Sequence, residues 1–102
     1  MHRVVVTGFG IVSSIGNNKS EVVESLHHGR SGITFSQEYA DLGFRSHVHG
    51  DVDIDLDANI DRKLKRFMGD SAAYNYIATE EAIQHAGLAE EQVSHLRTGL
   101  IM

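Results

Sequence analysis

The stretch VVVTGFGIVSSIGNN, residues 4–18, begins with β-branched residues, continues through two closely spaced glycines and ends in small polar residues. The run from Val4 to Thr7 predicts a buried strand, because β-branched side chains favour extended backbone. Gly8 and Gly10 then predict a turn, and Asn18 predicts the start of a helix. A strand, glycines and a helix in this order also occur in dinucleotide-binding folds, so that alternative must be tested first.

The glycine spacing lacks the other parts of a dinucleotide fingerprint. The fingerprint needs G-x-G-x-x-G or G-x-G-x-x-A directly before a helix, and an acidic residue about 20 positions later. Here Ser13 occupies the third position, and the residue about 20 positions after Gly10 is Arg30. Without a helix N-terminus at this point there is no dipole to hold a pyrophosphate. We therefore interpret the glycines as a structural strand-to-turn connection and expect no cofactor.

Three helices are predicted further along the chain from capping residues at their starts and glycines at their ends. The first begins after Asn18 or Ser20 and ends at Gly29, the second runs from Arg62 to Met68 after Asp61, and the third runs from Ser71 to Ala86 between Asp70 and Gly87. Five alanines in the third helix allow neighbours to approach closely. We expect it to be a central and well-covered element.

The segments between these helices carry weaker signals. Residues 37–45 predict an irregular polar loop. Residues 46–56 predict an extended, exposed segment, because apolar and acidic side chains alternate along it. A second apolar strand is predicted at residues 99–102.

The two predicted strands, near the two ends of the sequence, are joined by a long helical crossover. Two parallel strands do not form a stable sheet by themselves. We therefore expect residues 1–102 to be the N-terminal part of one domain of a larger α/β protein, with few strands and about three helices.

Composition excludes several classes of function. The 102 residues carry a net charge of -5 and contain no cysteine. The charge argues against a general nucleic-acid binder, and the missing thiol excludes disulfides, thiolate metal sites and a cysteine nucleophile within this sequence. No apolar run approaches the roughly 20 residues needed to cross a bilayer. We expect a cytoplasmic protein without membrane contact.

Acidic and histidine residues between positions 47 and 57 raise the possibility of a metal site. An EF-hand loop needs Gly at its sixth position and Glu at its twelfth, and neither the register from Asp51 nor that from Asp53 provides them. His47 and His49 share a face with Asp51, but zinc ligands usually come from separated segments. We interpret the carboxylates as a solvated acidic face and the histidines as surface residues, and expect no metal.

The most distinctive feature is the basic run Arg62-Lys63-Leu64-Lys65-Arg66. It contains four of the nine basic residues of an otherwise acidic chain. Arg62 and Arg66 lie one helical turn apart, and Lys63 lies beside them. Such a face can attract an acidic partner. On the residues alone, a solvated helix surface with Asp61 and Asp70 as local counter-charges is the favoured interpretation of the run.

Several motifs, in one order, resemble a known family. Residues 4–16 resemble the opening strand and turn of β-ketoacyl-acyl-carrier-protein synthases, and residues 29–33 (GRSGI) resemble the turn that follows their first helix. Residues 45–48 (RSHV), 60–63 (IDRK) and 66–68 (RFM) are similar to the synthase I branch, and residues 82–83 and 86–88 continue the match. The resemblance covers essentially the whole chain, from Arg3 to Ile101.

The resemblance implies a layered, thiolase-like α/β fold and a condensing enzyme of fatty-acid biosynthesis. Family members are acyltransferases that load an acyl group onto a cysteine and join it to malonyl-acyl-carrier protein with loss of carbon dioxide. The resemblance places the nucleophilic cysteine and the two catalytic histidines beyond these 102 residues. No catalytic role is therefore assigned to any residue of this chain, and the chain alone is expected to be inactive.

The resemblance also supplies an acidic partner for the basic run. Family members dock the acyl- or malonyl-loaded carrier protein on a basic patch, and Arg62, Lys63 and Arg66 match positions of that patch. Lys65 stands where an apolar residue is expected. The full-length protein is expected to be a homodimer. The alternative is a stand-alone interaction module that binds an acidic protein through the same three residues.

Overall fold

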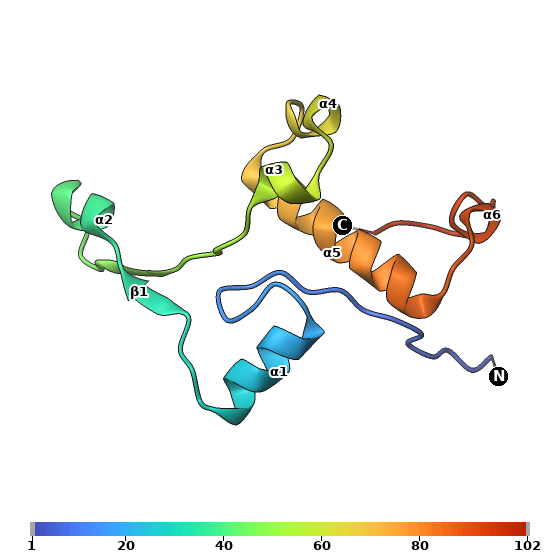
Figure 1. Ribbon diagram of the computed structural model, residues 1–102, viewed down its shortest axis with the longest axis horizontal. Coiled ribbons are helices and arrows are strands. Elements are labelled where there is room, and N and C mark those ends of the chain that lie inside the picture. Colours follow the sequence, from blue (N-terminus) through green and yellow to red (C-terminus); the bar gives the residue numbers. More distant parts are fainter. Residues whose placement is uncertain (1, 102) are drawn as a thin grey trace.

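The computed structural model describes residues 2–101 and contains six helices and two short strands (Figure 1). In chain order these are α1 Lys19–His27, β1 Ile33–Phe35, α2 Gln37–Asp41, β2 Val48–Gly50, α3 Leu56–Asn59, α4 Arg62–Lys65, α5 Asp70–Ala86 and α6 Glu90–Val93. The prediction of an α/β structure with few strands is confirmed. The described residues form three more helices than predicted: α2, α3 and α6, each only four or five residues long.

Helix α5 is the longest element, with 17 residues (Figure 1). It begins one residue earlier than predicted: Gly69 is the N-cap residue and Asp70 lies in the first turn, where its negative charge faces the positive end of the helix dipole. Gly87 ends the helix with φ 66°, a left-handed conformation that glycine adopts without steric cost. The prediction that α5 is well covered is only partly right, since Ala73 is its only buried residue.

The strand predicted from Val4 to Thr7 is absent, and this prediction was wrong. These residues belong to no strand, and the side chain of Val4 is 93% exposed. The β-branched run finds no partner strand among residues 2–101. It continues instead as an extended segment beside α5 (Figure 1). The second predicted strand fails in the same way, because residues 99–101 are irregular and Ile101 is 98% exposed; Met102 lies outside the described residues.

Gly8 and Gly10 bring the N-terminal segment into contact with the backbone of α5. A Cβ atom added at Gly10 would lie 1.8 Å from the carbonyl oxygen of Ala78, and one at Gly8 would lie 2.6 Å from the amide nitrogen of Ala86. These distances leave no room for a side chain. The glycines therefore serve close packing against a helix. The strand-to-turn connection predicted for them is wrong, because residues 8–10 belong to neither a strand nor a turn.

Polar contacts from α5 fix this segment. The Glu81 carboxylate accepts hydrogen bonds from the backbone N–H groups of Ile11 at 2.8 Å and Lys19 at 3.4 Å. The Phe9 ring packs edge-on against His85, with centroids 5.1 Å apart. The N-terminal segment, the start of α1 and α5 thus form one connected unit.

Helix α1 follows the sequence prediction at both ends. The Asn18 side chain accepts a hydrogen bond from the Glu21 amide at 3.0 Å, and Gly29 follows the helix with φ 61°. Val22 is buried, whereas Val23 and Leu26 are exposed.

Residues 33–50 form an arm that extends away from α5 (Figure 1). Strands β1 and β2 pair antiparallel, with Ile33 opposite Gly50 and Phe35 opposite Val48. The prediction of an irregular loop at 37–45 was wrong in its first half, where helix α2 forms instead. The Ser36 side chain caps this helix by accepting a hydrogen bond from the Tyr39 amide. The alternation predicted for 46–56 is confirmed after Gly50: residues 52, 54 and 56 are half-buried and residues 51, 53 and 55 are exposed.

Candidate docking surface

A capping aspartate and a short helix position the basic run. The Asp61 carboxylate accepts a hydrogen bond from the Lys63 amide at 2.8 Å, and the Asp61 carbonyl accepts from the amides of Leu64 and Lys65 at 2.9 Å. The regular helix ends at Lys65, three residues before the predicted end. Arg66 nevertheless keeps a helical conformation, with φ -58° and ψ -17°. One turn of helix with a helical C-cap therefore presents the whole basic run.

Lys65 differs from the other three cations because it makes an ion pair. Its Nζ lies 2.8 Å from the Asp57 carboxylate, and its side chain is 30% exposed. The pair joins α4 to α3, whose first turn contains Asp57. Lys65 therefore supports the placement of α4.

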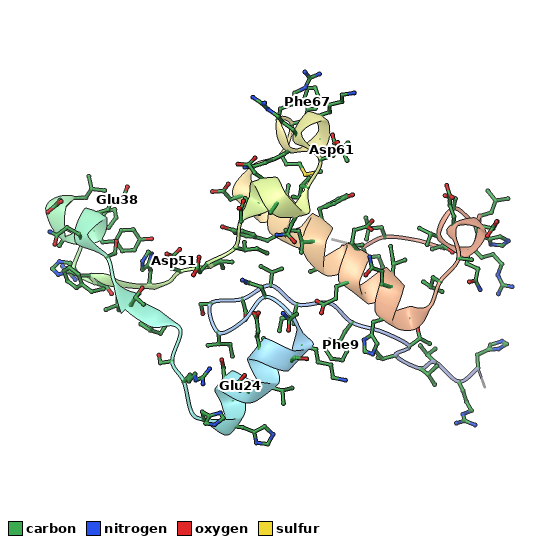
Figure 2. The ribbon with its side chains drawn as sticks, in the orientation of Figure 1. Phe9, Glu24, Glu38, Asp51, Asp61 and Phe67 are labelled. Atoms are coloured by element: carbon green, nitrogen blue, oxygen red, sulfur yellow. The ribbon has the colours of Figure 1, made fainter. Side chains whose placement is uncertain are left out.

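Arg62, Lys63 and Arg66 are exposed, and we call them the cationic surface. None of the three makes an ion pair with a carboxylate of residues 2–101. Neither Asp61 nor Asp70 makes an ion pair with these three cations: Asp61 caps the backbone of α4, and Asp70 lies in the first turn of α5. Figure 2 shows nitrogen-tipped side chains projecting outward beside the labelled Phe67. The three positive charges are therefore available to an external partner.

Two apolar side chains accompany the cationic surface, and sequence reasoning missed both. Phe67 is 77% exposed and Leu64 is 46% exposed. The Arg66 guanidinium carbon lies 4.5 Å from the centre of the Phe67 ring, within the range of a cation–π contact. The adjacent Arg-Phe pair in a basic run was the only available signal, and by composition alone a phenylalanine is assigned to the core.

The carboxylates that were examined as calcium ligands in the sequence do not form a metal site among the described residues. Asp55 caps α3 by accepting hydrogen bonds from the amides of Asp57 and Ala58, and Asp57 pairs with Lys65. Within residues 2–101, no group of three histidine or carboxylate side chains is arranged to hold a metal ion. His47 and His49 pack edge-on against Phe35 and Tyr39 respectively.

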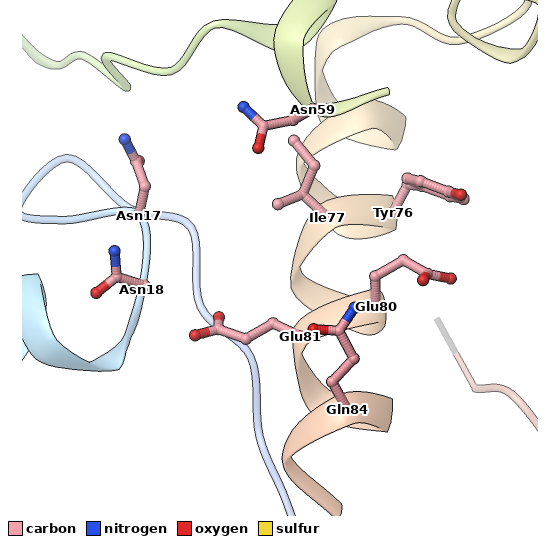
Figure 3. Close-up of a pocket in the computed structure, with 8 residues that line it drawn as sticks. All are labelled: Asn17, Asn18, Asn59, Tyr76, Ile77, Glu80, Glu81 and Gln84. Carbon is pink, nitrogen blue, oxygen red and sulfur yellow. The ribbon is translucent and has the colours of Figure 1, made fainter. Parts of the chain in front are cut away.

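A polar cavity of about 410 Å³ lies between the start of α1, the end of α3 and one face of α5 (Figure 3). Asn17 and Asn18 approach from one side, and Glu81 extends toward them from α5. The Glu81 carboxylate already accepts the two backbone hydrogen bonds described above. The side chains that line the cavity include no cation, histidine or aliphatic hydroxyl to act on a substrate.

No helix in the described part of the chain combines the length and apolar character needed to span a membrane.

Comparison with known sequences identifies the family. A sequence model described as "Beta-ketoacyl synthase, N-terminal domain" matches residues 1–102. The chain is 55% identical over 102 residues to the "3-oxoacyl-[acyl-carrier-protein] synthase 1" of Haemophilus influenzae, covering 100% of this chain and 25% of that protein. It is 56% identical over 102 residues to the protein of the same name from Escherichia coli strain K12, covering 99% of this chain and 25% of that protein.

A more distant relative has a corresponding name. The "3-oxoacyl-[acyl-carrier-protein] synthase I, chloroplastic" of Arabidopsis thaliana is 30% identical over 93 residues, which are 90% of this chain and 20% of that protein. The chain spans about a quarter of the length of the first two relatives. The match over all 102 residues confirms the resemblance read from the sequence motifs: the chain belongs to the beta-ketoacyl synthase family and is similar to the N-terminal portion of its relatives.

Proposed function

We propose that this chain is the N-terminal part of a fatty-acid-elongating condensing enzyme with a thiolase-like fold, and that its cationic surface docks acyl carrier protein. Family membership supports the class of reaction. The names of the relatives support the carrier protein as partner. We further propose that the full-length protein is a cytoplasmic homodimer.

In the proposed reaction, a cysteine thiolate attacks the acyl thioester and releases the carrier thiol. Decarboxylation of malonyl-acyl-carrier protein then gives a carbanion equivalent, which attacks the acyl-cysteine carbonyl. The products are carbon dioxide, a β-ketoacyl-carrier thioester and the regenerated thiolate. Residues 1–102 contain no cysteine, so the nucleophile must come from other residues.

We therefore expect this chain alone to be catalytically inactive. Incubating it with acyl- and malonyl-carrier protein should give no β-ketoacyl product. Any condensation above the rate without protein would contradict this expectation.

The observation that carries the docking proposal is the unpaired state of three neighbouring cations among the described residues. Arg62, Lys63 and Arg66 carry three positive charges on one side of α4, on a chain whose net charge is -5. A local field of this kind accelerates encounter with an acidic protein and fixes its orientation. Lys65 forms an ion pair with Asp57, so the cationic surface contains only the other three of the four basic residues.

Charge reversal in the full-length protein tests this role. We expect the double substitution Arg62→Glu and Arg66→Glu to weaken carrier-protein binding by roughly tenfold or more and to flatten its dependence on salt. The matched control is Arg45→Glu, which reverses another exposed cation, between α2 and β2, that makes no ion pair with the described residues. Unchanged affinity in the double variant, or an equal loss in the control, would contradict the docking role.

A further inference from the structure

We propose that Phe67 is an apolar anchor within the cationic surface, and that the partner is an acidic protein whose docking helix presents an apolar side chain among its carboxylates. The proposal rests on the docking function and adds the contact that holds the partner after charge has attracted it. It is carried by the exposure of Phe67, its place beside the cations and its contact with Arg66.

The position of Phe67 follows from the helical course of α4. Successive residues of a helix are rotated by about 100°. Arg62, Arg66 and Lys63 consequently occupy one arc. Phe67 follows in the turn after the helix, where its amide donates a hydrogen bond to the Leu64 carbonyl at 3.1 Å. Lys65 lies outside this arc, in agreement with its ion pair to Asp57. An acidic partner that covers the cations therefore also reaches Phe67.

The contact with Arg66 prepares both side chains for binding. With the guanidinium 4.5 Å from the ring centre, each side chain restricts the other, and Phe67 is still 77% exposed. Side chains already held in place lose less entropy when they enter an interface. Aromatic residues and arginine are also the types enriched among the residues that dominate binding energy.

Charge complementarity selects the kind of occupant. Three cations without ion-pair partners among residues 2–101 complement carboxylates on a partner, and a large exposed ring beside Arg66 complements an apolar side chain on the same partner. Leu64, at 46% exposure, lies beside Phe67 and extends the apolar part of the surface. An amphipathic acidic helix provides both features on one face.

The test compares Phe67→Ala and Phe67→Leu in the full-length protein, titrated with purified acyl carrier protein at several salt concentrations. We expect Phe67→Ala to weaken binding about tenfold, because it removes most of a large apolar side chain from the interface. The salt dependence should remain that of the unsubstituted protein, since no charge changes. Phe67→Leu should stay within about threefold, because it keeps most of the apolar volume.

Two controls show whether a loss of affinity is specific to the interface. Phe44→Ala removes another exposed aromatic ring, on the arm, and should leave affinity unchanged. The unfolding temperature of Phe67→Ala should match that of the unsubstituted protein. If this variant melts earlier or does not fold, Phe67 packs within the full-length protein and the proposal is wrong.

The remaining outcomes also decide between an anchor and its alternatives. If Phe67→Leu loses as much affinity as Phe67→Ala, the ring acts by holding Arg66, which contradicts an apolar anchor. If Phe67→Ala binds normally while the double charge reversal weakens binding, the anchor is wrong and the docking function stands. If the charge reversal has no effect, the docking function fails and the anchor fails with it.

Discussion

Gly10 lies so close to the backbone of α5 that no side chain can be added without moving one of the two segments. Its φ is not in the left-handed region, so the requirement for glycine comes from contact alone. The Ala78 carbonyl oxygen occupies the space that a Cβ atom would need. Gly10 therefore allows the N-terminal segment to lie directly against α5 at this point.

We predict that Gly10→Ala lowers the free energy of unfolding of the full-length protein by about 1–3 kcal/mol, the usual range for overpacking. Denaturant titration measures the change. Gly99→Ala is the matched control, because a Cβ atom there meets no other atom within 4 Å. Equal effects of the two substitutions would show that contact with α5 is not the reason for glycine at position 10.

Single residues that act on their immediate neighbours could be predicted from the sequence. Asn18 and Asp61 cap helices through side chains that accept hydrogen bonds two or three residues ahead, and Gly87 ends α5 through its own φ. The residues of the cationic surface could also be named from the sequence. The ion pair of Lys65 was not, because Asp57 belongs to a separate short helix whose orientation the sequence does not encode locally.

Helix α4 depends on two attachments at the scale of the element. Asp61 caps its start, and the Lys65–Asp57 pair joins it to α3. A single turn is too short to be stable by itself. The order of the cationic surface therefore depends on these contacts.

Substitutions at Asp61 can separate the cap from the charge. Asp61→Asn removes a negative charge beside the cations and keeps the capping oxygen, so we expect carrier-protein binding at least as tight as in the unsubstituted protein. Asp61→Ala removes the same charge and also the cap, which contributes about 1 kcal/mol to helix stability. We expect it to bind about two- to fivefold more weakly than Asp61→Asn in the same titration. Identical affinities for the two variants would show that the cap does not order the surface.

The strand predictions failed at this same scale, for one physical reason. Strand propensity describes how well a side chain fits a pleated, half-buried surface, and it requires a neighbouring strand. The runs at Val4 to Thr7 and at residues 99–101 have no such neighbour among the described residues. Helix α2 was missed because residues 37–41 carry no apolar stripe, and its start depends on the Ser36 side chain.

The whole molecule exposes much more surface than a compact domain of its size. The accessible area is 8546 Å², whereas a folded chain of 11.2 kDa is expected to expose about 5,700 Å². The radius of gyration is 17.0 Å, against about 13 Å for a compact domain of 100 residues. The buried hydrophobic side chains within residues 2–101 are Val22, Ile60 and Ala73.

We predict that the isolated 102-residue chain binds a hydrophobic dye strongly and unfolds without a cooperative transition, because so small a core does not offset the entropy of ordering the chain. Circular dichroism during heating and dye fluorescence measure the two properties. A sharp two-state transition with little dye binding would favour the alternative of a stand-alone interaction module. That alternative uses the same cationic surface. If it is correct, the same three residues bind the acidic partner, but within an independently folded module.

The proposed function depends on α4 being the place where the carrier protein docks. Photo-crosslinking in the full-length protein tests this most directly, with a photoreactive amino acid placed at position 63 or, for comparison, in place of the exposed Glu38 on the arm. We predict that acyl carrier protein is captured from position 63, that high salt, about 1 M, abolishes the capture, and that position 38 gives none. Capture from position 38 with none from position 63 would contradict the docking surface described for Arg62, Lys63 and Arg66.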